Sequence, residues 1–84
     1  MSFADDVRNY CIENIVDPAR SNGQNTIKIR AGDIHKLMEY KDRMPLVCSA
    51  LGAKTFEGQA RVKRLSVEGP TNGANCIFEF EILT

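Results

Sequence analysis

Residues 30–52 read RAGDIHKLMEYKDRMPLVCSALG and contain two short helical patterns separated by a charged turn. In the first pattern the apolar side chains recur at helical spacing, at Ile34, Leu37 and Met38. This spacing predicts a helix over about residues 33–40, with an acidic residue near its N-terminus, where a negative charge suits the helix dipole. The pair of helices is either a device for contacting nucleic acid or the middle of a compact fold, and the flanking segments help to decide between the two.

The second pattern predicts a helix over about residues 45–56. Pro45 suits its first turn, because the N–H that proline lacks would be unpaired there anyway. One side of this helix is apolar and is expected to face inward: Leu46, Val47, Ala50 and Leu51. The other side consists of small groups and is expected to be exposed: Pro45, Cys48, Ser49 and Gly52. Glycine inside a helix costs about 1 kcal/mol relative to alanine, so Gly52 indicates close approach by another molecule, a tight helix crossing or an early helix end.

The flanking segments add one helix and three strands. Before the helix pair, the patterns predict an amphipathic helix over about 3–16, a loop DPARSNGQN at 17–25 and a half-buried strand TIKIR at 26–30. After it, they predict a hairpin of strands RVKRLSV at 61–67 and CIFEFEIL at 76–83, joined by EGPTNGAN at 68–75. These patterns predict a core of Val7, Tyr10, Ile27, Ile29, Ile34, Leu37, Val47, Leu51, Leu65, Phe78 and Phe80.

Length and composition describe an ordinary small protein. The 84 residues are enough for one small domain, 1–84, and the 43% of apolar residues is typical of a globular chain. No run is long and apolar enough to span a bilayer, and the first ten residues lack the layout of a signal peptide. We therefore expect a cytoplasmic protein.

The three cysteines, Cys11, Cys48 and Cys76, are odd in number and far apart. They form neither a disulfide framework nor a C-x-x-C pair, so we expect no metal site and no cofactor, with Cys11 and Cys76 buried in the core. The sequence also has no P-loop, dinucleotide fingerprint or H-E-x-x-H motif. We therefore expect a protein that is not an enzyme.

Charge is unevenly distributed along a chain whose net charge is zero. Residues 25–64 hold nine basic and four acidic side chains, whereas residues 1–24 and 65–84 are both net acidic. A positive region on a neutral protein is the minimum electrostatic requirement for binding nucleic acid. A solvated surface with no partner is the alternative explanation.

The order helix, strand, helix, helix, strand, strand resembles the winged helix-turn-helix family. The stretches TIKIRAGDIH and RMPLVCSAL are also similar to small proteins and appended domains associated with mobile elements. The winged-helix resemblance implies an α+β fold in which helix three, here Pro45–Phe56, enters the major groove of DNA and the hairpin tip, here Glu68–Asn75, forms the wing. Carried over to this chain, the nucleic-acid-binding residues would be Lys41, Arg43, Ser49, Lys54, Arg61, Lys63 and Arg64, whose six cations would hold phosphates.

One departure from that family bears on function. The outer side of helix three carries Ser49 but none of the Arg, Asn or Gln side chains that read base edges. The sequence therefore predicts a small regulatory protein that grips the backbone of double-stranded DNA, with a homodimer if the site is palindromic. The alternative is a protein-interaction winged helix that docks on, or inhibits, a nucleic-acid-processing complex.

Overall fold

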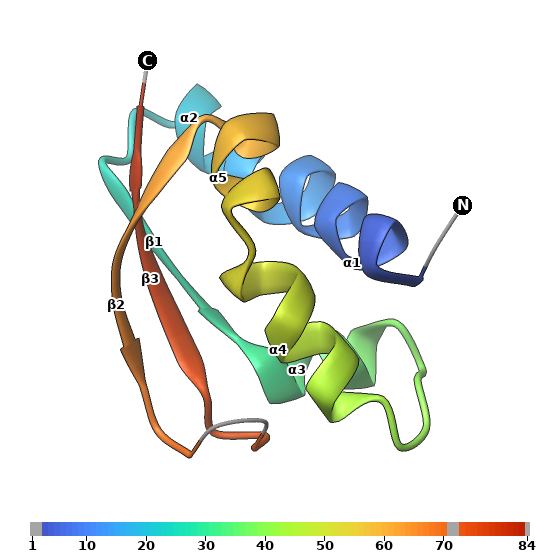
Figure 1. Ribbon diagram of the computed structural model, residues 1–84. Helices are drawn as coiled ribbons and strands as arrows, with labels where there is room; N and C mark the ends of the chain where they lie inside the picture. The colour runs from blue at the N-terminus through green and yellow to red at the C-terminus, as the bar shows by residue number, and fades with distance from the viewer. Residues whose placement is uncertain (1–2, 71–72, 84) are drawn as a thin grey trace.

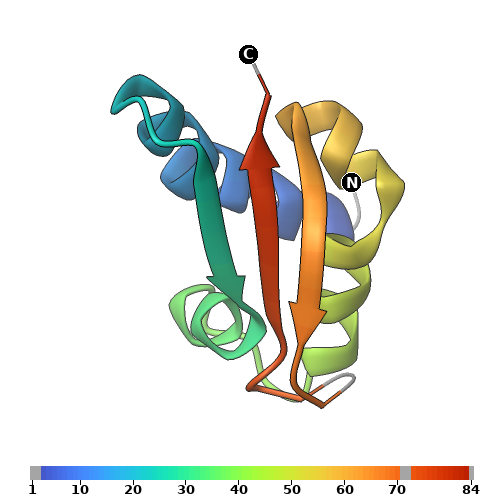
Figure 2. The ribbon, with the colours of Figure 1, turned by 90° about the vertical axis from the view of Figure 1, so that its left-hand side faces the viewer.

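A three-stranded antiparallel sheet with helices on one of its faces makes up the fold (Figures 1 and 2). The computed structural model describes residues 3–70 and 73–83. The strands lie in the spatial order β1-β3-β2, with β1 at Thr26–Arg30, β2 at Val62–Glu68 and β3 at Ile77–Ile82. The helices are α1 (Phe3–Cys11), α2 (Asp17–Ser21), α3 (Ala31–Leu37), α4 (Met44–Gly52) and α5 (Lys54–Ala60), with a π-helical segment, η1 (Ile12–Val16), between α1 and α2. The α+β class predicted from the sequence is confirmed.

The side chains of the central strand β3 alternate between the core and the outer face of the sheet. Its inner face is buried and consists of Phe78, Phe80 and Ile82. Its outer face carries Glu79 and Glu81, and no helix covers that face in Figure 2. The strand TIKIR has the predicted bounds, and its buried Ile27 and Ile29 pair with Phe80 and Phe78.

Strand β2 does not alternate, because a bulge interrupts its pairing with β3. Arg64 pairs with Phe80 and Ser66 with Glu79, so Leu65 is the extra residue between them. Leu65 is consequently 47% exposed, and its predicted place in the core is wrong.

The first helical region is longer than predicted, since helix continues through Pro18 to Ser21. Proline inside an α-helix loses a hydrogen bond and clashes with the carbonyl four residues earlier. The π-helical segment lies immediately before this point, and the N–H of Asp17 bonds to the carbonyl of Ile12, five residues back. This wider turn relieves the clash, so the predicted loop at 17–25 is wrong for its first five residues.

The predicted helix at 45–56 is two helices. The backbone of Ala53 is extended (φ −77°, ψ 143°), so α4 ends at Gly52 and α5 begins at Lys54. The early helix end expected at Gly52 is therefore observed. The change of direction buries Phe56, whose ring meets that of Phe80 edge to face with centroids 5.2 Å apart.

One further core prediction, Leu37, is wrong. Helix α3 buries Ala31 and Ile34, whereas Leu37, its last residue, is 61% exposed. Tyr10 flanks the buried Val7 and Cys11 and packs against the core with intermediate exposure, so the prediction that it is mostly buried is confirmed. The other predicted core residues are buried, as are Cys11 and Cys76: Val7, Ile27, Ile29, Ile34, Val47, Leu51, Phe78 and Phe80.

The loop end of the β2–β3 hairpin is held against the start of α3. The N–H groups of Ala31 and Gly32 donate to the carbonyls of Cys76 (2.9 Å) and Ala74 (3.0 Å). A β-carbon on Gly32 would lie 2.7 Å from that Ala74 oxygen, so only glycine allows this approach. The predicted wing tip, 68–75, includes residues 71 and 72, which lie outside the described residues.

Candidate nucleic-acid interface

Helix α4 presents a narrow, small-residue surface to solvent. Val47, Ala50 and Leu51 point into the core, as predicted, whereas Pro45 and Ser49 are exposed. The prediction for Cys48 is wrong, because it is buried beside the hairpin, with its thiol 4.0 Å from the carbonyl oxygen of Gly73. The hairpin thus covers one flank of α4 that a helical wheel leaves open.

A groove of about 270 Å³ lies where α4 meets the hairpin. It is lined by Cys48 and Ser49 from α4, Arg64 and Val67 from β2, and Gly69, Cys76 and Phe78. Its polar side chains are the Arg64 guanidinium and the Ser49 hydroxyl, and the described residues that line it include no carboxylate. The groove is therefore mainly apolar, with one positive charge.

Arg64 is held in this groove at two points. Its guanidinium donates to the carbonyl oxygen of Gly52 at 3.1 Å, which ties it to the C-terminal end of α4. Its backbone N–H donates to the Glu57 carboxylate at 2.9 Å. β2 is an edge strand, and bonding of its N–H to a side chain of α5 protects this part of the edge from pairing with another chain.

Arg43 and Lys41 lie at the opposite end of α4, in its connection to α3. Arg43 is the residue preceding the helix, and its backbone N–H donates to Nε2 of His35 at 3.0 Å. Its guanidinium lies 4.8 Å from the centre of the Phe3 ring, a cation–π distance. Both Lys41 and Arg43 are exposed.

Two of the remaining three predicted cations flank α5, and the third, Lys63, lies on β2. Lys54 begins α5 and is exposed, and Arg61 ends it in the left-handed conformation (φ 54°). Lys63 is exposed and pairs in register with Glu81 of the outer sheet face. Of the seven predicted residues, Ser49 and Arg64 line the groove, and the other five lie outside it.

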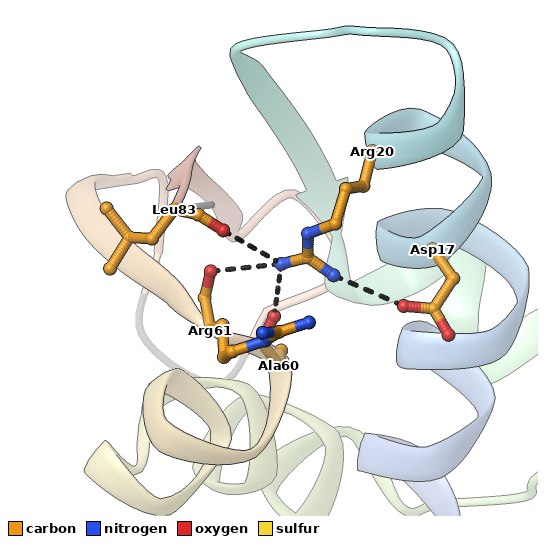
Figure 3. Close-up of polar contacts among 5 residues, drawn as sticks. All are labelled: Asp17, Arg20, Ala60, Arg61 and Leu83. Carbon is orange, nitrogen blue, oxygen red and sulfur yellow. Dashed lines mark hydrogen bonds and ion pairs between the residues drawn. The ribbon is translucent and has the colours of Figure 1, made fainter.

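The end of α5 is fixed by a distant side chain, Arg20 (Figure 3). One terminal nitrogen of Arg20 donates to the carbonyl oxygens of Ala60 (2.7 Å), Arg61 (3.1 Å) and Leu83 (3.4 Å). The other terminal nitrogen pairs with Asp17 at 3.3 Å. Carbonyls at a helix end have no partner within the helix, so Arg20 satisfies them and joins α2, α5 and the end of β3.

The six predicted cations share one electrostatic property. None of them forms an ion pair with a carboxylate within residues 3–70 and 73–83; the ion pairs there involve Arg8, Arg20 and Arg30. An exposed cation that has no carboxylate partner retains its full attraction for an external anion.

Sequence reasoning missed several residues that shape this site. Glu57 and Gly69 were not singled out, and Val67 was assigned only to a strand. Val67 could not be assigned to the groove from the sequence, because the bulge at Leu65 turns it to the same inner face as Arg64. Such a bulge leaves no mark in the residue pattern.

Comparisons of the chain with family models, with curated proteins and with solved structures found no match. None of the helices that the structure describes has the length and apolar character needed to cross a membrane. The same residues contain no cluster of three or more His, Cys, Asp or Glu side chains placed to hold a metal ion.

Proposed function

We propose that the protein is a small winged-helix DNA-binding protein of the regulatory kind, acting in the cytoplasm. In this proposal α3 and α4 form the helix-turn-helix and the β2–β3 hairpin is the wing. The order of elements and the sheet order β1-β3-β2 support it, as does the contact of the hairpin with α4 through Cys48. A homodimer is expected if the DNA site is palindromic.

The observation that carries the proposal is the pair of unpaired arginines at the two ends of α4. Arg43 precedes the helix, and Arg64 bonds to the carbonyl of its last residue, Gly52. A nine-residue helix is about 13 Å long, and the major groove of B-DNA is about 12 Å wide. The two arginines therefore lie near opposite ends of a helix whose length is comparable with the width of that groove, which supports contact with phosphates at both ends.

The surface between these arginines favours contact with the backbone over reading of bases. The small exposed side chains of α4 allow close approach, but Ser49 alone among them is a polar group able to contact a base edge. Lys41 and Lys54 extend the positive charge at the two ends of α4, whereas Lys63 lies opposite Glu81 and is expected to contribute less.

Salt dependence of duplex binding tests the proposal. Titration of a short synthetic duplex at about 50 and about 200 mM salt should show log affinity falling with log salt by roughly 0.9 for each phosphate neutralised. Arg43→Ala and Arg64→Ala should each weaken binding similarly on all sequences and reduce the slope by about one. Ser49→Arg should block binding, because it places bulk on the small-residue surface.

A second candidate function is docking on a protein of a nucleic-acid-processing complex. It is favoured by exposed apolar groups on β2, where Leu65 and Val67 are 47% and 44% exposed. If the cation variants leave duplex affinity and its salt slope unchanged while Ser49→Arg abolishes activity in the cell, protein docking replaces DNA binding.

A further inference from the structure

The groove between α4 and β2 has the chemistry of a site for part of a nucleotide. Its lining includes a guanidinium from Arg64 and a hydroxyl from Ser49, and the rest of the lining is apolar or small. We infer that this groove receives the phosphate and deoxyribose of a single nucleotide in a bound DNA strand, an inference that rests on the proposed DNA-binding function.

The size of the groove is compatible with part of a nucleotide. Sites for whole small molecules have volumes of roughly 300–1,000 Å³, and this groove measures about 270 Å³. The groove is therefore at the lower end of that range and has room for one phosphate and its sugar.

The charge and fixed position of Arg64 suit a phosphate. The guanidinium gives one bond to the carbonyl of Gly52, and a guanidinium has further N–H donors in its planar fork. Because the Gly52 carbonyl already holds the guanidinium, less side-chain freedom is lost when a phosphate binds. The Ser49 hydroxyl supplies a second donor on the facing wall.

The apolar wall suits a sugar. Val67 lines the groove and is 44% exposed, above a floor formed by Phe78 and two buried cysteines. A deoxyribose offers C–H groups that can cover Val67, whereas an isolated inorganic phosphate offers none. Contact with Val67 therefore distinguishes a nucleotide in a strand from a free anion.

The chain offers a matched pair of variants, Arg64→Gln and Lys63→Gln. The two residues are adjacent and lose the same charge, but Arg64 pairs with the buried Phe80 on the inner face and Lys63 with Glu81 on the outer face. Duplex affinity should fall about tenfold or more for Arg64→Gln and at most about twofold for Lys63→Gln. Urea melts of both variants establish that each is folded.

Equal losses for the two variants would show that only the general charge of β2 matters, and the inference would be wrong while the proposed function stands. If the parent protein shows no salt-dependent duplex binding, the proposed function fails and this inference fails with it. The two failures are therefore distinguishable.

Nuclear magnetic resonance of the unmutated protein gives a second readout that needs no variant. Addition of the duplex should shift both the Arg64 side-chain N–H signal and the Val67 methyl signals, whereas inorganic phosphate should leave the methyl signals in place. Shifts confined to Arg64 with both probes would identify a simple anion site and overturn the inference.

Discussion

The arginines of residues 3–33 and those of residues 41–64 have different environments. In the first region each arginine has an aspartate three residues away and pairs with it: Arg8 with Asp5 at 2.7 Å, Arg20 with Asp17 at 3.3 Å, and Arg30 with Asp33 at 2.8 Å. In the second region Arg43, Arg61 and Arg64 form no ion pair with any described carboxylate. The arginines of the first region are therefore paired with local aspartates, whereas those of the second region have no ion-pair partner among the described residues.

Sequence spacing explains the first region but not the second. Side chains three or four residues apart on a helix are neighbours, and by that rule Glu57 would pair with Lys54 or Arg61. In the structure Glu57 accepts the backbone N–H of Arg64 instead. Glu39 would similarly pair with Arg43, but Glu39 lies beyond α3 in the left-handed conformation (φ 57°). In the tertiary structure these two glutamates do not form the ion pairs that helical spacing predicts.

The largest expected effect of this difference is on stability. Arg20→Met keeps the aliphatic stem but removes the donors to Ala60, Arg61 and Leu83, so it should lower the free energy of unfolding by about 1.5–3 kcal/mol. The side chain is 21% exposed, so water only partly replaces the lost bonds. Urea denaturation measures the change.

Arg61→Met is the control from the second region. The Arg61 side chain is exposed, and its backbone carbonyl stays in place, so stability should change by less than about 0.5 kcal/mol. Similar losses for the two variants would contradict the distinction between arginines that stabilise the fold and arginines that are available to a partner.

An effect of intermediate size is expected for substitution of Gly52, which should weaken duplex binding without lowering stability. A β-carbon there would lie 3.6 Å from both an Arg64 terminal nitrogen and a Phe78 ring carbon, which is ordinary contact. Gly52→Ala should therefore leave stability unchanged or raise it by up to about 0.5 kcal/mol. It should nevertheless weaken duplex binding by about two- to fivefold, because a methyl group narrows the space beside Arg64. A variant that is more stable and binds equally well would place the contact surface elsewhere.

Alternation along the strands made much of the sheet predictable. Ile27, Ile29, Phe78 and Phe80 are buried because a strand side chain faces the core at every second position, and nothing interrupts β1 or β3. Residues that depend on long-range contacts were not predictable. The bulge at Leu65 and the break at Ala53 depend on how β2 and α5 pack against the rest of the fold.

The candidate site was predictable only in part. The helical wheel correctly placed Ser49 on the surface of α4. It placed Cys48 there too, since a wheel contains no information about the hairpin that covers that flank. Arg64 was one of six equivalent cations in the sequence, and only the structure distinguishes it, through its bonds to Gly52 and Glu57.

The smallest expected effect concerns Glu57, the sole acidic residue between Arg43 and Val67. Glu57→Gln keeps an oxygen that accepts the Arg64 N–H, so the fold should be retained with a change in stability of about 0.5 kcal/mol or less. Loss of one negative charge near the cations should tighten duplex binding by about twofold, as expected for charges about 10 Å apart in water. Asp33→Asn is the matched control in the first region: it removes the same charge from α3, where the carboxylate is bonded to Arg30 and not to any of the six predicted cations, so the gain in duplex affinity should be smaller than for Glu57→Gln. Parallel titrations at low salt compare the two, and an equal gain for both variants would mean that DNA responds to the total charge of the protein and not to the unpaired cations around α4.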